Sequence, residues 1–329
     1  MAPKYDVYGI GNALVDLETQ VSDQFLNENK VKKGWMTLVD EATQARLLAA
    51  IDQDEAKQKP GGSAANTMMA IGQLGGQAFY SCKVANDTHG DFYLADMRAS
   101  GISTNFERQK QPEGITGKCL VMITEDASRT MNTFLGITAT LSTREVDEQA
   151  IEQAEYVYIE GYLTASDTGF EAMKLVKETA DAAHVKTAIT LSDPSIVEGF
   201  KERFETVIGD GVDLLFCNEE EAQKYTGKEE LPAVQEALKK IARHFIITRG
   251  ADGVTIYDGT QTIDIDGLPV KAIDTNGAGD MFAGVFLYGI TNGMNYEEAG
   301  RLANIAGAKV VAQYGPRLQT QQMKGLLNR

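Results

Sequence analysis

The feature that most constrains the fold is a regular alternation of short apolar runs and longer helical patterns from residue 145 onward. We predict strands at 156–159, 187–191, 213–216 and 245–248, and helices at 168–183, 196–206, 219–226 and 231–242. Extended runs at 254–257 and 261–265 follow, and helices at 278–290 and 296–313 come last. Alternation at this spacing predicts an α/β fold with a doubly wound, mostly parallel sheet flanked by helices.

The first half of the chain adds strands at 5–11 and 78–84 and helices from Ser63 to Leu74 and near 88–100. It also contains extended runs without intervening helices, at 17–24, 34–39, 104–110, 117–124 and 129–135. Such runs inside an alternating chain indicate a separate small sheet. We therefore expect one domain over residues 1–329, with a small β-sheet lid formed by insertions at about 13–40 and 104–136.

Charge and cysteine content narrow the possible partners and the compartment. The 329 residues carry a net charge of −16, so neither nucleic acid nor an anionic membrane is an expected partner. The three cysteines, Cys82, Cys119 and Cys217, show no metal-like spacing, and no apolar N-terminal signal or long apolar run is present. These features predict a cytoplasmic protein.

A polar, glycine-rich loop, Asp274-Thr-Asn-Gly-Ala-Gly-Asp280, leads directly into the apolar helix predicted at 278–290. The first turn of such a helix presents unpaired N–H groups and suits a phosphate, so Gly277, Ala278 and Gly279 are candidate phosphate-binding residues. A carboxylate beside an anion site suggests a base acting on an attacking alcohol, which assigns Asp280 to catalysis. The alternative is that Asp280 merely caps the helix.

Polar residues also follow the first strand and precede the helix that begins at Ser63. Asn12 and Asp16 lie just beyond the strand end, where open α/β sheets bind ligands, and Asp16 could accept hydrogen bonds from two vicinal hydroxyls. A local turn that Asn12 and Asp16 stabilise is the alternative. Gly61, Gly62 and Ser63 allow a ligand to approach the backbone, and Asn66 offers both a donor and an acceptor.

The later strands carry polar residues at their ends as well. Asn218 and Glu221 lie on one face of the first turn of a helix, a spacing that by itself marks only a helix start. Thr248-Arg249-Gly250 follows the strand at 245–248, with Gly253 three residues later. Arg129, the basic residue of the last lid strand, could clamp a phosphate or be an exposed surface arginine.

The stretch from Asp274 to Asp280 matches the signature Asp-Thr-x-Gly-Ala-Gly-Asp, and the chain resembles the ribokinase-like (pfkB-type) carbohydrate and nucleoside kinases over its whole length. The resemblance implies that Asp280 is the catalytic base and that Gly277, Ala278 and Gly279 form the anion hole. Gly61, Gly62, Ser63 and Asn66 would bind the phosphate acceptor.

The same resemblance implies ATP and Mg²⁺ as cofactors, with a monovalent cation such as K⁺ as a further possibility. Asn218 and Glu221 would organise the metal, Glu221 through water. Thr248, Arg249, Gly250 and Gly253 would form a turn over the nucleotide phosphates, and Asn304 would contribute to the ATP site.

Within the family, the segments Gly11–Asp16, Ser22–Leu26 and Leu215–Ala222 are similar to the adenosine kinase branch. The implied reaction transfers the γ-phosphate of ATP to the 5′-hydroxyl of adenosine. Asp16 would hold the ribose hydroxyls, assisted by Asn12, Gly62 and Asn66. Met36, Phe134 and Tyr162 could stack on a purine or could equally be lid packing.

Three features differ from the animal adenosine kinases: Met36 in place of a glutamine, Glu160 before Gly161, and the ending Tyr314-Gly-Pro-Arg317. A sugar kinase acting on a ribose- or fructose-like acceptor is therefore the alternative enzyme. A catalytically silent ligand-binding relative is the alternative class, against which the presence of Asp280 argues. A nicotinamide-dependent enzyme is rejected, since Gly9-x-Gly11 lacks the third glycine of that motif. A monomer or a homodimer is expected.

Overall fold

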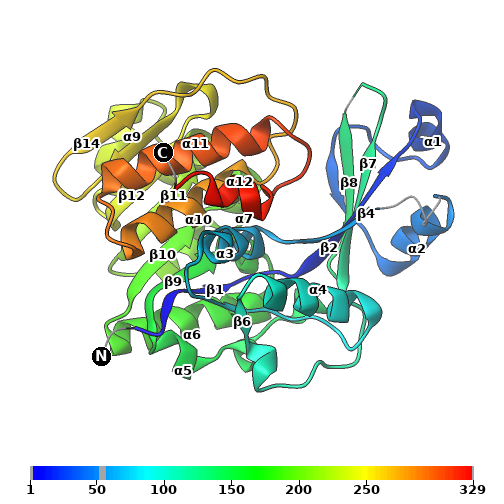
Figure 1. The fold of residues 1–329 in the computed structure, drawn as a ribbon, viewed down its shortest axis with the longest axis horizontal. Helices are drawn as coiled ribbons and strands as arrows, with labels where there is room; N and C mark the ends of the chain where they lie inside the picture. The colour runs from blue at the N-terminus through cyan, green and yellow to red at the C-terminus, as the bar shows by residue number, and fades with distance from the viewer. Residues whose placement is uncertain (1–2, 52–56, 127, 328–329) are drawn as a thin grey trace.

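The computed structural model describes residues 3–51, 57–126 and 128–327. A nine-stranded sheet with helices on both faces forms the large body, and a five-stranded sheet lies to one side of it (Figure 1). The predicted α/β fold with a mostly parallel sheet and a second small sheet is confirmed. None of the helices within the described ranges combines the length and apolarity needed to cross a membrane.

The large sheet has the strand order β14-β13-β12-β11-β10-β9-β1-β5-β6. Pairing is parallel from β6 to β12, and β13 and β14 are antiparallel. The chain proceeds outward in opposite directions from β1 and β9, so the topological switch point, where open sheets bind ligands, lies between them. The strands are β1 (Tyr5–Ile10), β5 (Ala78–Ser81), β6 (Ser103–Thr104), β9 (Ala154–Glu160), β10 (Lys186–Thr190), β11 (Val212–Asn218), β12 (Ala242–Thr248), β13 (Val254–Tyr257) and β14 (Thr262–Ile265).

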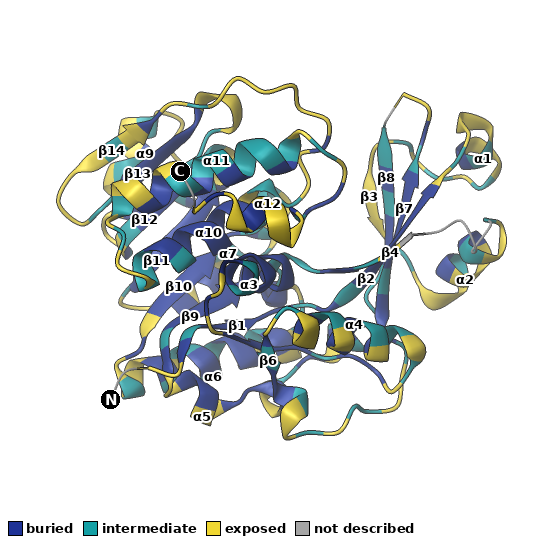
Figure 2. Cartoon of the chain, in the orientation of Figure 1, coloured by how far each residue is buried: buried dark blue, intermediate teal, exposed yellow. Residues whose placement is uncertain are grey.

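Helices cover both faces of this sheet, and each face has its own hydrophobic core. Along β11, Leu214 and Phe216 belong to one core, and Leu215 and Cys217 belong to the other. This alternation follows from the two-residue period of a strand and buries the sheet on both sides (Figure 2). The first core includes α3 (Ser63–Leu74), α4 (Thr88–Ala99), α10 (Ala278–Thr291), α11 (Tyr296–Val311) and α12 (Thr320–Lys324). The second includes α5 (Glu148–Ile151), α6 (Asp167–Ala183), α7 (Pro194–Ile208), α8 (Glu219–Thr226) and α9 (Leu231–Leu238).

The small sheet has the order β3-β8-β7-β2-β4. Its strands are β2 (Leu14–Gln20), β3 (Met36–Leu38), β4 (Lys57–Gly61), β7 (Gly117–Ile123) and β8 (Arg129–Phe134). Two helices, α1 (Asp23–Glu28) and α2 (Glu41–Ala49), lie on its side away from the large body and bury Leu26 and Leu47 (Figure 1). Asp16 pairs with Cys119 across to β7, and Cys119 pairs with Thr133 on β8, so these three side chains share one face.

Several predicted elements of the small sheet and its surroundings are wrong. The run at 17–24 is β2 followed by α1, which begins after Ser22, whose Oγ accepts a hydrogen bond from Phe25 N at 3.1 Å. Neither α2 nor β4 was expected. The predicted lid strand at 104–110 is instead β6, a member of the large sheet, followed by a 3₁₀ turn (Asn105–Glu107). The helix predicted at 231–242 ends at Leu238, and β12 begins at Ala242.

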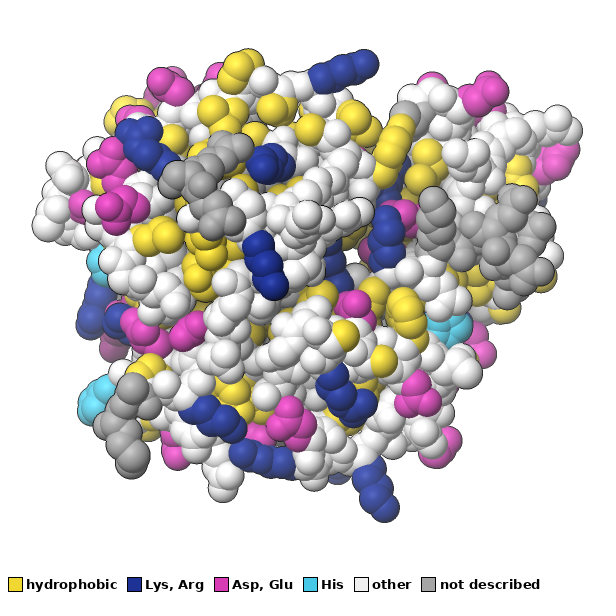
Figure 3. Space-filling view, in the orientation of Figure 1, with side chains coloured by type: hydrophobic (Ala, Val, Ile, Leu, Met, Phe, Trp, Pro, Cys, Tyr) yellow, Lys and Arg dark blue, Asp and Glu magenta, His cyan; other side chains and the backbone are white. Residues whose placement is uncertain are grey.

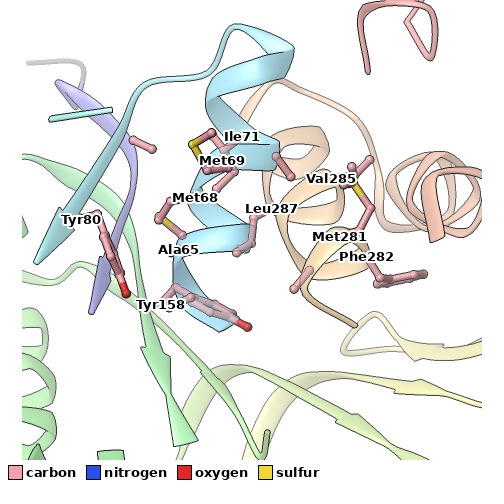
Figure 4. Close-up of a cluster of buried hydrophobic side chains, with 14 of the residues drawn as sticks. Ala65, Met68, Met69, Ile71, Tyr80, Tyr158, Met281, Phe282, Val285 and Leu287 are labelled. Atoms are coloured by element: carbon pink, nitrogen blue, oxygen red, sulfur yellow. The ribbon is translucent and has the colours of Figure 1, made fainter. Parts of the chain in front are cut away.

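Helix α3 packs closely against α10, and side chains of both helices belong to one buried cluster (Figure 4). A Cβ at Gly284 would lie 2.4 Å from the carbonyl oxygen of Thr67, so glycine is needed for the two helices to approach this closely. Met68 of α3 and Val285 and Leu287 of α10 are buried in the same core. Ser63 at the start of α3 hydrogen-bonds to Asp280 in the first turn of α10, so the N-terminal turns of the two helices lie side by side.

Candidate active site

The glycine-rich loop ends in an open helix N-terminus. Gly277 is the N-cap of α10 with φ of 75°, and a Cβ there would lie 2.4 Å from Cβ of Pro316. Glycine is therefore required both by the backbone conformation and by the neighbouring chain. At Gly279 an added Cβ would meet no described atom within 4 Å. The N–H of Ala278 donates to the carbonyl oxygen of Thr275 at 3.3 Å, whereas Gly279 is exposed. The N–H of Gly279 is thus accessible to a phosphate.

Asp280 lies in the first turn of α10, but its side chain contacts α3 rather than the N-terminus of its own helix. Its Oδ1 accepts a hydrogen bond from Ser63 Oγ at 2.6 Å, and its Oδ2 accepts one from Asn66 Nδ2 at 3.0 Å. The capping interpretation is wrong, because Gly277 is the N-cap and no side-chain cap bond forms there. Burial raises the pKa of Asp280 to about 6, and the hydrogen bonds from Ser63 and Asn66 oppose the rise.

The buried carboxylate of Glu160 connects the ends of β1 and β9 to helix α3 at the topological switch point. Glu160, the last residue of β9, accepts hydrogen bonds at Oε1 from Asn12 N (3.2 Å) and Asn12 Nδ2 (3.0 Å). Its Oε2 accepts one from Ala64 N of α3 at 2.9 Å. Burial raises the pKa of Glu160 to about 7, and these hydrogen bonds lower it. Sequence reasoning recorded Glu160 only as a departure, although a charged residue ending a buried strand is a signal for such a role.

Asn12 is therefore anchored by contacts distant in the sequence. Besides Glu160, its Oδ1 accepts a hydrogen bond from Thr138 Oγ1 at 3.3 Å, and its carbonyl oxygen accepts one from Tyr80 at 3.0 Å. These partners replace the local turn that was the alternative for this residue. Asn12 lies two residues after the end of β1, at the carboxyl edge of the large sheet.

Asp16 lies in β2, on the face of the small sheet that Arg129 and Glu18 share by register. A Cβ at Gly61 would lie 2.6 Å from Oδ1 of Asp16, so this carboxylate occupies space that only glycine leaves. Burial raises the pKa of Asp16 to about 7, and the charge of Arg317 is the largest opposing influence. Only burial and nearby charges shift the pKa of Asp16, with no hydrogen bond from the described residues among the causes, so its carboxylate is free to accept from a ligand.

Two of the three side chains considered for a purine lie on opposite faces of the small sheet. Met36, half exposed on β3, shares a face of the small sheet with Asp16. Phe134 pairs with Lys118, which places it on the opposite face. Tyr162 lies in the 3₁₀ turn after β9 (Gly161–Ala165), where burial and the carboxylates of Asp193 and Asp280 raise its pKa.

Arg129 joins the small sheet to the glycine-rich loop. It donates hydrogen bonds to Glu18 at 2.8 Å and to Asp274, the first residue of that loop. Asp274 also accepts from Gly315 N at 2.8 Å. With its side chain 10% exposed, Arg129 is not a surface arginine. Figure 3 shows Lys or Arg side chains where the large body meets the small sheet.

Near the ends of β11 and β12, Asn218 and Glu221 form hydrogen bonds with each other. Glu221 Oε2 accepts from Asn218 N at 3.0 Å, its Oε1 accepts from Asn218 Nδ2 at 2.7 Å, and Asn218 Oδ1 accepts from Glu221 N at 2.8 Å. Burial, followed by the charge of Asp193, raises the pKa of Glu221 to about 7. Within the described ranges no cluster of three or more metal-ligating side chains forms. Carboxylate and amide oxygens are ligand types that Mg²⁺ accepts, so the pair is a candidate to hold a hydrated ion.

The other residues expected at the ATP site lie near the same edge. Thr248 pairs with Asn218 across β12 and β11, and Arg249 leads into a 3₁₀ turn (Gly250–Asp252) that ends at Gly253. Arg249 Nη2 lies 3.6 Å from Asp264 of β14. Asn304 Nδ2 donates to the carbonyl oxygen of Asp266 at 2.9 Å, which ties α11 to the loop after β14.

Arg317 is a site residue that sequence reasoning did not identify. It follows α11 and donates from Nε to Asn66 Oδ1 at 2.7 Å and from Nη1 to Asp96 Oδ2 at 3.0 Å. The only sequence signal was the unusual ending at 314–317, which carries no information about what the arginine contacts.

Comparison with known proteins agrees with this geometry. The family model described as pfkB family carbohydrate kinase matches residues 38–323. An adenosine kinase structure from Sinorhizobium meliloti is 33% identical with a TM-score of 0.88, covering 99% of both chains. A probable sugar kinase structure from Rhizobium etli CFN 42 is 31% identical with a TM-score of 0.86, covering 99% of this chain and 98% of that one. The adenosine kinase of Saccharomyces cerevisiae is 26% identical over 95% of this chain and 97% of its own length.

A ribokinase-like sheet with an open, glycine-rich helix N-terminus and an adjacent carboxylate defines a phosphotransferase that acts on an alcohol group. The chain belongs to the pfkB carbohydrate kinase family.

Proposed function

We propose that this protein transfers the γ-phosphate of ATP to the 5′-hydroxyl of a ribonucleoside, with adenosine as the preferred acceptor. The observation that carries the proposal is Asp280, held by Ser63 and Asn66 beside the open first turn of α10. The similarity to adenosine kinases from Sinorhizobium meliloti and Saccharomyces cerevisiae supports the choice of acceptor.

In this mechanism Asp280 removes the proton of the attacking hydroxyl. Each of its oxygens accepts one hydrogen bond from α3, which orients the carboxylate and leaves lone pairs for the substrate. The N–H groups of Gly277, Ala278 and Gly279 hold the oxygens of the transferring phosphoryl group. Positioning and electrostatic stabilisation account for most of the catalysis in phosphoryl transfer.

The acceptor lies between the two sheets in this proposal, with Asp16 accepting hydrogen bonds from its 2′- and 3′-hydroxyls. The unpaired carboxylate of Asp16 has the chemistry for a cis-diol. Gly61 and Gly62 allow the sugar to approach the backbone, and Asn12 and Asn66 lie at the end of β1 and on α3. The small sheet would act as a lid, which Arg129 fastens through Asp274.

ATP would lie along the carboxyl edge near β11 and β12, against Thr248, Arg249, Gly250, Gly253 and Asn304. Bound Mg²⁺ would neutralise charge on the phosphates, with Asn218 and Glu221 holding its water. We further propose that the protein is cytoplasmic and that it is a monomer or a homodimer. A monovalent cation such as K⁺ is a further proposed cofactor.

A sugar acceptor is the second candidate. The placement of Phe134 and Met36 on opposite faces of the small sheet favours it, because these two side chains then cannot stack on the same base. The similarity to a probable sugar kinase from Rhizobium etli CFN 42 supports it too.

A panel of acceptors with ATP and magnesium tests the proposal. We expect adenosine to be phosphorylated, and ribose and fructose to be poor acceptors because they lack a base. A free sugar with far higher kcat/KM than adenosine would overturn the nucleoside assignment and leave the base and the phosphate site in place.

The role of Asp16 gives a prediction of its own. We expect 2′-deoxyadenosine or 3′-deoxyadenosine to lose about 1–3 kcal/mol of binding, since one oxygen of a buried carboxylate then lacks its partner. In Asp16→Ala adenosine should bind more weakly, and the penalty for each deoxy analogue should shrink. Calorimetric dissociation constants for all three ligands in both proteins measure this, and an unchanged penalty in the variant contradicts the contact.

The pH dependence of kcat follows from the pKa of Asp280. A base must be deprotonated, so kcat should rise as the pH increases through about 6. Hydrogen bonds to the charged carboxylate lower its pKa, so Ser63→Ala should move this rise to higher pH. Steady-state kcat from pH 4.5 to 8.5 in both proteins checks the prediction. A rise that stays in place or moves to lower pH would remove Ser63 from this role.

A further inference from the structure

The guanidinium of Arg317 reaches into the site from the segment between α11 and α12. Its side chain is 13% exposed and is anchored on one side by Asp96 of α4, at 3.0 Å. On the other side Nε donates to Asn66 Oδ1 at 2.7 Å. The remaining nitrogen, Nη2, is buried and has no hydrogen-bond partner within the described ranges. A buried donor without a partner is unfavourable, so Nη2 is a candidate to bind a ligand.

The contact with Asn66 determines which way its amide faces. Guanidinium nitrogens only donate, so the group that faces Arg317 must be the amide oxygen. The amide nitrogen is then directed to the Asp280 carboxylate, which only accepts. In the reverse orientation the amide nitrogen would face the donating guanidinium of Arg317, and the amide oxygen would face the carboxylate of Asp280. Neither contact could then be a hydrogen bond. Arg317 therefore selects the amide orientation that stabilises ionised Asp280.

The surroundings of Nη2 suggest what it binds. The charge of Arg317 lowers the pKa of both Asp16 and Asp280, so the guanidinium lies within electrostatic reach of both. Arg317 forms no ion pair with either within the described ranges. A hydroxyl can donate to a carboxylate and accept from a guanidinium at once, so it could satisfy both Asp16 and Nη2.

We propose that Arg317 is a further residue of the acceptor site, which orients Asn66 toward Asp280 through Nε and donates from Nη2 to an oxygen of the bound acceptor. The inference rests on phosphoryl transfer at Asp280 but not on whether the acceptor is a nucleoside or a sugar.

Two variants and their combination test the proposal with the best acceptor of the panel. In Arg317→Gln we expect KM for the acceptor to rise by roughly 10- to 100-fold, since a charge-assisted hydrogen bond is lost. The kcat should fall as well, because the Asn66 amide is no longer fixed. If that loss acts through Asn66, Arg317→Gln combined with Asn66→Ala should have the kcat of Asn66→Ala alone. The proposal is overturned if the kcat losses of the two single variants multiply in the double variant. It is also overturned if Arg317→Gln has the KM of the wild type.

Two controls separate these effects from loss of folding or of function. Arg108 forms an ion pair with buried Asp147 at 2.8 Å, so Arg108→Gln removes a comparable pair elsewhere and should keep wild-type kinetics. Solvent exchange of the Asn66 side-chain amide, followed by NMR, needs no acceptor and should be faster in Arg317→Gln. If the wild type phosphorylates nothing in the panel, the proposed function fails and this exchange decides the inference: an unchanged rate overturns it.

Discussion

Asp280→Asn is expected to lower kcat by roughly 10²- to 10⁴-fold while acceptor binding stays nearly intact. The side chain keeps its shape but can no longer take a proton. Its present partners, Ser63 and Asn66, both donate to it, so the ionised carboxylate is the form that this pocket stabilises. Other groups bind the acceptor in its ground state, so the dissociation constant of the acceptor should change little.

The measurement combines steady-state kinetics with calorimetric titration of the acceptor. Asp213→Asn is a matched control: Asp213 lies at the amino end of β11, far along the strand from the site, and accepts a hydrogen bond from Thr187 N at 2.8 Å. We expect the control to keep its kcat. An Asp280→Asn enzyme within a few-fold of wild-type kcat would show that another group removes the proton.

The large sheet and the glycine-rich loop could be predicted because their signals are local. Apolar runs and helical periods identify the strands and helices one by one, and their alternation then determines a parallel sheet. The stretch from Asp274 to Asp280 likewise carries its own conformation in its glycines and adjoining helix. For the same reason, polar residues that follow strands could be assigned to one edge before any contact was known.

The small sheet could not be predicted to the same extent, because tertiary contacts determine parts of it. Its strand β4, Lys-Gln-Lys-Pro-Gly, has neither strand propensity nor alternation and forms only as an edge partner of β2. The short helices α1 and α2 do have local signals in their caps, Ser22 and Asp40. The prediction of a lid strand at 104–110 failed because only Thr104 of this run lies in a strand, at the edge of the large sheet, and Asn105–Glu107 form a 3₁₀ turn.

The links within the site were also beyond sequence patterns. Arg317 and Asn66 are 251 positions apart, and Glu160 contacts Asn12 across 148 positions. In both pairs, the packing of α3 against the sheet and against α10 determines which polar residues become partners. A pattern search finds residues of suitable chemistry, but it does not show which of them share a hydrogen bond.

Gly277→Ala is expected to lower kcat by roughly 10²- to 10³-fold, the range seen when an anion-hole donor is lost. The φ of 75° at Gly277 lies in the left-handed region, which costs a residue with a Cβ about 1–2 kcal/mol. A Cβ would also lie 2.7 Å from the Cα of Pro316, which is backbone and cannot rotate away. The loop must therefore shift, and the N–H groups of the first turn of α10 shift with it.

Gly293→Ala separates displacement of the anion hole from general strain. Gly293 follows the other end of the same helix, has φ of 87°, and an added Cβ would meet no described atom within 4 Å. Both variants should lose stability through backbone strain, but only Gly277→Ala should lose kcat. Thermal unfolding and steady-state kinetics of the two variants measure the two effects. If both variants keep the wild-type kcat, displacing the glycine-rich loop leaves the reaction unaffected. The backbone of this loop then does not bind the transferring phosphoryl group.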